Sequence, residues 1–239
     1  MDAFDCVRCE VRDGIAWLTL DRPLKANAYS VRMRDELHEL LDALRAVDEV
    51  HVIVIRGAGD KGFCGGADLS EFLTAPSVLQ ARRIRALRDL WTLLRTMPQP
   101  TIAALHGHVL GSGVEIAMFC DLRIAADDVV IGLPEMSLGI LPGAGGTQTV
   151  PRSIGLAHAL DLLLTDRRLD ADEALAAGLV TRCVPRAALA DTVESLARRL
   201  AGFEPAVLRA AKRALHEGAD LPLPQALRLE ARLAAVHAT

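Results

Sequence analysis

The segment that most constrains the fold is His51–Arg56 (HVIVIR), a nearly continuous apolar run that Gly57-Ala58-Gly59 brings to an end. A run of this length is typical of a strand, and a strand without polar alternation is typical of a sheet covered on both faces. Thr101–Leu105 (TIAAL) has the same character. The sequence therefore predicts a sheet whose central strands are buried on both sides.

Helical patterns alternate with the strands in the first half of the chain. After a predicted strand at Ile15–Leu20, Ser30 is the expected N-cap of a helix that runs to about Val47 and keeps its apolar residues mostly on one face. A second long helix is expected over Gln80–Met97, because Pro98 disfavours helical geometry in the residue before it.

The pattern changes in the last third of the chain, which is almost entirely helical. Helices are expected over residues 156–164, 172–177, 186–201, 205–216 and 224–236, with one strand at Leu179–Val184 between them. Strands that alternate with helices and are followed by a helical tail predict an α/β fold. We expect residues 1–185 to form the α/β core and residues 186–239 to form a helical C-terminal region used for oligomerisation.

Composition excludes several classes of function. The net charge of −4 gives no reason to expect a nucleic-acid partner. No apolar run approaches the length of a membrane span, and the N-terminal segment is acidic where a signal peptide is basic and then apolar. The five cysteines, an odd number, indicate reduced thiols and a cytoplasmic protein. Cys6 and Cys9 are interpreted as strand residues rather than as a zinc or redox pair.

Three segments carry the candidate chemistry: Phe63–Leu69 (FCGGADL), Ala103–Glu115 (AALHGHVLGSGVE) and Leu133–Thr147 (LPEMSLGILPGAGGT). The second reads as a strand, a glycine turn and a helix start, where backbone N–H groups have no intrahelical acceptor. If this turn met the small-residue turn at Gly65–Ala67, the two would give a two-donor oxyanion hole. Taken singly, either glycine-rich turn is more typical of an ordinary turn than of a binding site.

Two carboxylates stand in apolar surroundings. Glu115 lies one turn into a largely apolar helix, and Glu135 follows Gly132-Leu133-Pro134. Charged residues are uncommon in such places unless they are paired or functional, and burial raises the pKa of a carboxyl toward the range where acid–base catalysis works best. From the residues alone, two exposed helix-edge glutamates are an equally good interpretation.

In this order, the three segments resemble the signature of the enoyl-CoA hydratase/isomerase (crotonase) family. The resemblance covers nearly the whole chain, because Arg22-Pro23…Asn27-Ala28 is similar to the start of family members and Thr165-Asp166-Arg167…Gly178-Leu179-Val180 to their later part. It implies a crotonase-like spiral of β-β-α units with a helical C-terminal region, assembled as a homotrimer or homohexamer.

The resemblance also implies roles for individual residues. The thioester oxygen of an acyl-CoA would lie between the backbone N–H groups of Ala67 and Ser112. Glu115 would orient and deprotonate water, and Glu135 would deliver a proton to Cα. The substrate and its coenzyme A moiety are expected to contact Lys25, Ala26, Gly65, Ala67, Asp68, Leu69, Gly111 and Gly143. Neither a metal nor a redox cofactor is expected; coenzyme A enters as part of the substrate.

Two departures from the family pattern bear on these expectations. Family hydratases usually have glycine where this chain has Ser112, and their chains usually continue for one helix beyond the place where this sequence ends. The favoured activity is hydration of an enoyl-CoA. An isomerase that uses Glu135 alone and a non-catalytic crotonase-fold binding or assembly subunit are the alternatives. The acyl group is not readable, since variable stretches such as Leu73–Leu94 are expected to form the pocket wall.

Overall fold

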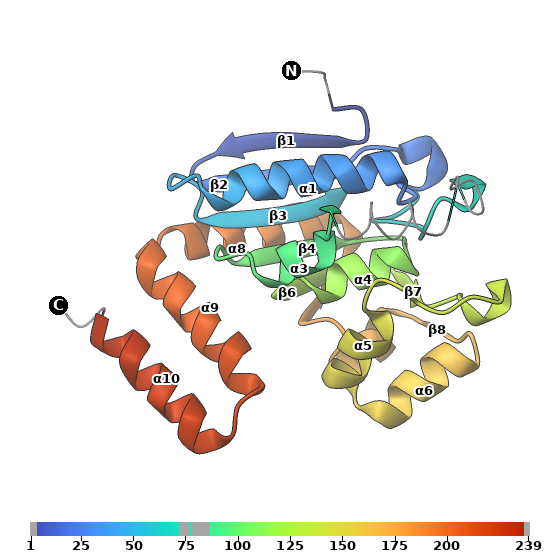
Figure 1. Cartoon of the computed structure of the whole chain (residues 1–239). Coiled ribbons are helices and arrows are strands. Elements are labelled where there is room, and N and C mark those ends of the chain that lie inside the picture. The colour runs from blue at the N-terminus through green and yellow to red at the C-terminus, as the bar shows by residue number, and fades with distance from the viewer. Residues whose placement is uncertain (1–3, 72–76, 78–86, 237–239) are drawn as a thin grey trace.

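A six-stranded sheet forms the centre of the molecule in the computed structural model, which describes residues 4–71, 77 and 87–236 (Figure 1). Its strands, in spatial order, are β1 (Val7–Arg12), β2 (Ile15–Leu20), β3 (Val52–Gly57), β4 (Thr101–Leu105), β6 (Leu122–Ala126) and β9 (Arg182–Val184). β1 pairs with β2 in antiparallel fashion, and every other neighbouring pair is parallel. Parallel pairing requires crossover connections, which the intervening helices and loops supply.

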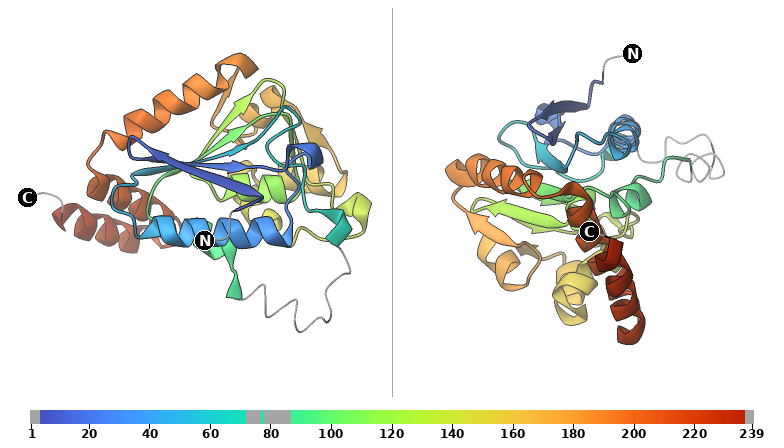
Figure 2. Two further views of the ribbon diagram at one scale, coloured as in Figure 1. Left: turned by 90° about the horizontal axis from the view of Figure 1, so that it is seen from above. Right: turned by 90° about the vertical axis from the view of Figure 1, so that its left-hand side faces the viewer.

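Successive residues of the central strands alternate between two hydrophobic cores. In β3, Val52 and Val54 belong to the core beneath helix α8 (Leu189–Ala201), whereas Ile53 and Ile55 belong to the larger core on the other face. This confirms that the run at residues 51–56 is a strand buried on both faces. Figure 2 shows α8 on one side of the sheet and helix α1 (Val31–Arg45) on the other.

Helix α1 begins where the sequence predicts. The Ser30 hydroxyl accepts a hydrogen bond from the N–H of Met33 at 3.2 Å, which satisfies one of the donors that a helix start leaves open. Its apolar face is buried through Met33, Leu37, Leu41 and Leu44. A burial of this kind fixes α1 against the sheet and thereby places the residues at its N-terminus.

A smaller sheet and several short helices surround the larger core. The sheet contains β5 (His108–Leu110), β7 (Val130–Gly132) and β8 (Arg168–Leu169). The short helices are α3 (Leu90–Arg95), α4 (Ser112–Met118), α5 (Gly146–Ile154), α6 (Leu156–Leu164) and α7 (Ala171–Ala176). The 3-10 turns are η1 (Pro23–Lys25), η2 (Leu69–Glu71), η3 (Met136–Leu138) and η4 (Arg186–Ala188).

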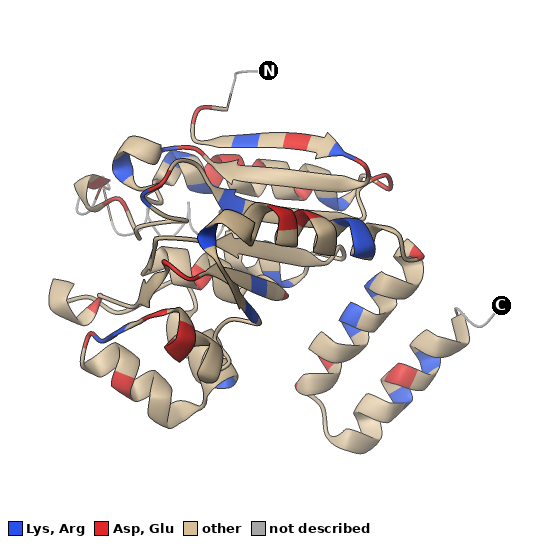
Figure 3. Ribbon diagram, turned by 180° about the vertical axis from the view of Figure 1, so that it is seen from behind, with Lys and Arg blue, Asp and Glu red and all other residues tan. Residues whose placement is uncertain are grey.

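Helices α9 (Pro205–Ala219) and α10 (Leu223–Val236) pack against each other and stand out from the rest of the molecule (Figures 1 and 2). Both lie where the sequence predicts helices. Basic and acidic side chains are interspersed along them, as Figure 3 shows from behind. In the described part of the chain, no helix is long and apolar enough to cross a bilayer.

Some predicted elements differ from those observed. The predicted strand Leu179–Val184 is shortened to Arg182–Val184, and α5 was not expected, because Pro151 lies inside it and glycines precede it. The helix predicted over Gln80–Met97 falls partly on residues 80–86, outside the described residues, and α3 covers its end.

The α/β class and the helical C-terminal region are confirmed. The boundary between residues 185 and 186 stays a prediction. Helix α8, which that boundary assigns to the C-terminal region, packs on the central sheet through Leu189, Val193 and Leu196.

Candidate active site

Backbone hydrogen bonds bring the three candidate segments together. Strands β5 and β7 pair in parallel, and the N–H of Gly111 donates to the carbonyl of Gly132 at 2.9 Å. The first segment joins them through Cys64, whose N–H donates to His108 and whose carbonyl accepts from Leu110. The two glycine-rich turns therefore meet in the fold, as the oxyanion-hole hypothesis requires.

The glycines of the second segment admit neighbouring parts of the chain itself. A Cβ atom at position 113 would lie 2.3 Å from the carbonyl oxygen of Cys64, so only glycine fits there. Gly111 has a φ of 49°, and a Cβ on it would lie 2.9 Å from Oε1 of Glu135. Both glycines therefore allow close packing within the site.

Ala67 and Ser112 lie in the wall of one cavity. Tyr29 forms a parallel bridge to Ala67, in which the Tyr29 N–H donates to Gly66 and the Tyr29 carbonyl accepts from Asp68, each at 2.8 Å. In such a bridge the N–H of the intervening Ala67 points away from Tyr29. Ser112 is the first residue of α4, so its N–H has no acceptor within the helix.

Glu115 is almost fully buried and firmly held. Its side chain is 2% exposed, and Oε1 accepts hydrogen bonds from the N–H groups of Ala144 at 2.8 Å and Gly146 at 2.9 Å. A Cβ atom at position 146 would lie 3.2 Å from the same oxygen. The sequence shows Gly143-Ala144-Gly145-Gly146, but nothing in its spacing indicates that these N–H groups orient a glutamate.

Glu135 is buried in a different environment. It is 7% exposed, and its Oε2 is buried without a hydrogen-bond partner among the described residues. Burial raises the pKa of Glu135 to about 7, and the nearby charge of Glu115 acts in the same direction. A carboxyl with this pKa both gives up and takes a proton readily at neutral pH. The interpretation of both glutamates as exposed helix-edge residues is wrong.

Asp68 ties the first segment to the turn that precedes α1. Its carboxylate accepts hydrogen bonds from Ser70 at 2.6 Å and Arg22 at 2.7 Å, and it lies 3.3 Å from Nζ of Lys25. These partners, Ser70 and Arg22 first, hold the pKa of Asp68 well below its usual range. Asp68 thereby fixes the loop that carries Ala67, and Arg22 is a part of this arrangement that the sequence did not single out as a site residue.

The cavity has a volume of about 480 Å³. Of the predicted site residues, it is lined by Ala67, Asp68, Ser112, Glu115, Glu135 and Gly143. The predicted residues Lys25, Ala26, Gly65, Leu69 and Gly111 lie beside it rather than in its wall. The N–H of Gly65, for example, donates a hydrogen bond to the carbonyl of Ala26 at 2.8 Å.

Several residues of the cavity wall were not predicted. They are Tyr29, Ser30, Val31, Arg34, Glu71, Ile140, Leu141 and Ala144. The rings of Tyr29 and Trp91 lie 5.6 Å apart and give the wall an aromatic part. Of the stretch 73–94 expected to form the wall, residues 73–76 and 78–86 lie outside the described residues, and Arg88 and Trp91 do line the cavity.

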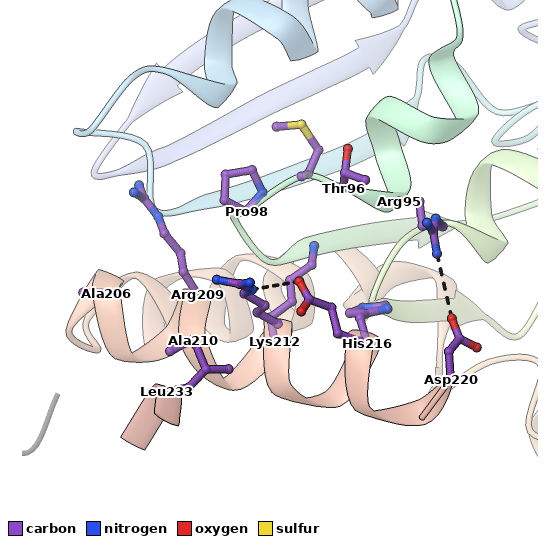
Figure 4. A pocket seen from close by; sticks show the side chains of 13 residues that line it. Arg95, Thr96, Pro98, Ala206, Arg209, Ala210, Lys212, His216, Asp220 and Leu233 are labelled. Carbon is purple, nitrogen blue, oxygen red and sulfur yellow. Dashed lines mark hydrogen bonds and ion pairs between the residues drawn. The ribbon is translucent and has the colours of Figure 1, made fainter. Parts of the chain in front are cut away.

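A larger cavity, of about 670 Å³, lies between α9 and residues 95–98 (Figure 4). It contains none of the predicted site residues. Basic groups line it, and they are engaged in ion pairs: Arg95 with Asp220, Lys212 with Asp121, and Arg213 with Glu217. The candidate chemistry therefore belongs to the smaller cavity.

Comparisons with known proteins agree with this arrangement. A model of the family described as enoyl-CoA hydratase/isomerase matches residues 10–238. Crotonyl-CoA hydratase from Syntrophomonas wolfei is 38% identical over 233 residues, which cover 96% of this chain and 88% of that protein. (E)-Benzylidenesuccinyl-CoA hydratase from Thauera aromatica is 38% identical over 219 residues, which cover 91% of this chain and 84% of that protein.

A solved structure shows the same fold. The crystal structure of an enoyl-CoA hydratase from Bacillus anthracis matches with a TM-score of 0.91 and 35% identity, and the match covers 97% of this chain and 90% of that one. The spiral of strands and helices expected from the sequence is thus the crotonase fold, and the chain belongs to the enoyl-CoA hydratase/isomerase family.

Proposed function

We propose that this protein is an enoyl-CoA hydratase, which adds water reversibly across the 2,3-double bond of an acyl-CoA thioester. The observation that carries the proposal is the pair of buried glutamates beside one cavity. Glu115 is held by two backbone donors, and Glu135 has an oxygen without a hydrogen-bond partner among the residues that the structure describes. Two carboxyl groups in unequal environments suit a reaction that needs a base and an acid in one step.

The thioester oxygen would lie between the N–H groups of Ala67 and Ser112. As water attacks Cβ, negative charge develops on this oxygen, and two fixed donors stabilise it most strongly in the transition state. Because Oε1 of Glu115 is held by Ala144 and Gly146, the direction of its second oxygen is fixed as well, and that oxygen would take the proton from water. Glu135 would then give its proton to Cα.

The proton changes during the reaction agree with Glu115 as the base and Glu135 as the acid in hydration. Hydration converts Glu115 from carboxylate to acid and Glu135 from acid to carboxylate, and dehydration reverses both changes. With its pKa raised to about 7, Glu135 is populated in both forms at neutral pH, so it can serve either direction. Since the reaction changes no oxidation state and the donors are backbone groups, we propose that it uses neither a metal nor a redox cofactor.

The family contains other activities, and two alternatives remain. An isomerase would need only Glu135, whose raised pKa and whose oxygen without a partner in the described part of the chain suit proton transfer between carbons. A non-catalytic subunit would need neither glutamate. The relatives named above are described as acting on crotonyl-CoA and benzylidenesuccinyl-CoA, so membership of the family leaves the acyl group open. A cytoplasmic location likewise remains a proposal.

One experiment distinguishes a hydratase, an isomerase and a non-catalytic subunit. The protein is mixed in parallel with a 2-enoyl-CoA and with a 3-enoyl-CoA, and the absorbance of the conjugated thioester is followed. A hydratase removes the absorbance of the 2-enoyl-CoA, and the 3-hydroxyacyl-CoA product is identified by mass. An isomerase generates that absorbance from the 3-enoyl-CoA without adding water. The proposal is overturned if the 2-enoyl-CoA is not hydrated.

A further inference from the structure

Two polar side chains, Tyr29 and Arg34, lie in the wall of the active-site cavity beyond the groups that the reaction uses. Ser30 is the N-cap of α1, so Tyr29 immediately precedes the cap and Arg34 is the fourth residue of the helix. Side chains at these two positions commonly meet across the helix start, usually as an apolar pair. Here the pair is a phenol and a guanidinium, which gives this part of the wall hydrogen-bond donors.

Tyr29 is fixed in place and carries an unused donor. Its backbone bonds to Gly66 and Asp68 on either side of Ala67, so its position is tied to the loop that bears the proposed oxyanion donor. Its hydroxyl is buried without a hydrogen-bond partner in the described part of the structure. Burial also raises the pKa of Tyr29, so the phenol stays protonated and can donate.

Arg34 lines the same cavity as Tyr29. Its side chain is 15% exposed, and its Nε and Nη2 donate to Oδ1 of Asp35 at 3.0 and 2.8 Å. Those two bonds leave Nη1 as the donor that Asp35 does not engage. Both side chains line the same cavity, and the charge of Arg34 opposes the rise in the pKa of Tyr29.

We propose that Tyr29 and Arg34 form a polar subsite that selects acyl groups bearing an oxygen acceptor beyond the reacting double bond. An apolar acyl chain that filled the cavity would leave the Tyr29 hydroxyl unpaired and would strip water from the Arg34 guanidinium, which is costly. An acyl chain with a carbonyl, hydroxyl or carboxylate oxygen would satisfy them, so the site would reject the analogue that lacks the oxygen. Trp91, Ile140 and Leu141, which also line the cavity, would accept the carbon chain.

This inference rests on the proposed function, because it assumes that the cavity receives an acyl-CoA. It is tested by binding, with saturated acyl-CoAs that cannot be hydrated. Three series of the same chain lengths end in a methyl group, a methyl ketone or a carboxylate. Their dissociation constants are measured by calorimetry for the wild type, Tyr29→Phe and Arg34→Met. Arg32→Met is the matched control, since Arg32 lies on the same helix and pairs with Glu36 outside the cavity.

The wild type is expected to bind at least one oxygen-bearing series roughly tenfold more tightly than the methyl series of equal length. This ratio should fall below about threefold in Tyr29→Phe and Arg34→Met and persist in Arg32→Met. A loss in Arg34→Met confined to carboxylates assigns an anionic acyl end, and a loss shared by the ketones assigns a neutral oxygen. Thermal melts confirm that each variant is folded.

Two results overturn the subsite: equal binding of all three series by the wild type, or a ratio that Arg32→Met lowers as much as Arg34→Met does. Failure of the proposed function is a separate outcome. If no enoyl-CoA is hydrated while the binding ratio holds, the subsite stands and the reaction is wrong. If hydration occurs without the ratio, the reaction stands and the subsite is wrong.

Discussion

Glu115 and Glu135 are the same side chain placed in two environments, and the difference decides what each can do. Glu115 is held by two N–H groups, so its position is fixed. Glu135 keeps a buried oxygen that has no partner in residues 4–71, 77 and 87–236, which costs folding free energy whenever the group is ionised. A residue retained at such a cost is typical of a functional site, where stability and activity oppose each other.

The pH dependence of stability tests the state of Glu135. Its pKa is raised from 4.5 to about 7, so between these values the native state binds more protons than the unfolded state, and stability falls as pH rises. The Glu135→Gln variant should not show this loss of stability as pH rises. We expect the variant to exceed the wild type by up to about 3 kcal/mol in urea unfolding at about pH 8, and by much less near pH 5.

The control is Glu39→Gln, an exposed residue of α1 that lies outside the cavity. Glu39→Gln should show the same difference in unfolding free energy between about pH 5 and about pH 8 as the wild type. If Glu135→Gln and Glu39→Gln give the same pH profile, burial does not raise the pKa of Glu135 as described.

Substitutions at Ser112 separate its backbone from its side chain. If the N–H is an oxyanion donor, Ser112→Ala and Ser112→Gly should keep most of the hydration activity. Ser112→Pro should lose roughly 10²–10³ in kcat, because proline has no N–H. Position 112 is the first residue of α4, where proline is well tolerated, so the variant is expected to fold.

The contrast between alanine and proline decides the role of Ser112. A thermal melt and the affinity for an acyl-CoA establish that Ser112→Pro is intact. Should folded Ser112→Ala lose as much activity as Ser112→Pro, the hydroxyl itself takes part in the reaction and the backbone account is wrong.

Among the elements, helix α9 is attached to the core in part through one largely buried carboxylate, that of Asp121. Asp121 lies 2.7 Å from Nζ of Lys212 and 2.7 Å from Nε2 of His216, and it also accepts from the N–H and hydroxyl of Thr101. Burial alone would raise the pKa of Asp121, but the bonds from His216 and Lys212 lower it below its usual range. Asp121 thus fixes the angle at which α9 leaves the body.

Removal of one partner should leave this charge buried and uncompensated. Lys212→Met is expected to cost roughly 3 kcal/mol in denaturant unfolding, since Lys212 and Asp121 are only 10% and 16% exposed. The neighbouring variant Arg213→Met breaks an exposed pair with Glu217 and should cost less than about 1 kcal/mol. Equal costs for the two variants would show that the Asp121 cluster does not anchor α9.

The elements also show what a sequence can and cannot predict. The strand at residues 51–56 was predictable because burial on both faces demands an apolar residue at every position. Helix α5 was not, since Pro151 and the preceding glycines oppose a helix that packing nevertheless supports. Arg34 was missed because a helical pattern shows which residues are apolar but not which polar ones line a cavity.

For the candidate active site, the roles of the two glutamates and of the two proposed oxyanion residues were predicted through the family resemblance. Their spacing alone left Glu115 and Glu135 open to an exposed, structural interpretation. The groups that hold Glu115, the N–H groups of Ala144 and Gly146, carry no side-chain signal at all. Contacts made by the backbone depend on the tertiary fold and cannot be read from residue types.

At the scale of the whole molecule, the apolar residues of the C-terminal helices differ in how far they are buried. The apolar residues on one face of α8 are buried within the chain, against the central sheet. On and next to α9 and α10, by contrast, large apolar side chains remain exposed: Phe203, Val207, Leu215, Leu223, Leu227 and Val236. A helix pair with such a surface is typical of a protein–protein contact.

The family resemblance implies a homotrimer or homohexamer, and we predict that α9 and α10 contact a neighbouring subunit in that assembly. Light scattering at micromolar concentration should give three or six times the chain mass of 25.7 kDa. Leu215→Glu, at the most exposed of these positions, should shift the mass toward the monomer, whereas Leu156→Glu on α6, exposed to a similar degree, should not. A monomer mass for the wild type would contradict the prediction.

The most direct test of the account as a whole is enoyl-CoA hydration by the glutamate variants. Glu115→Gln keeps the size of the side chain and an oxygen for Ala144 and Gly146, but it cannot take a proton. We expect hydration to fall by roughly 10²–10⁴ in Glu115→Gln and in Glu135→Gln, with acyl-CoA binding retained. The double variant should lose less than the product of the two single losses, because both residues serve one step. A folded Glu115→Gln that hydrates at near the wild-type rate would contradict the account.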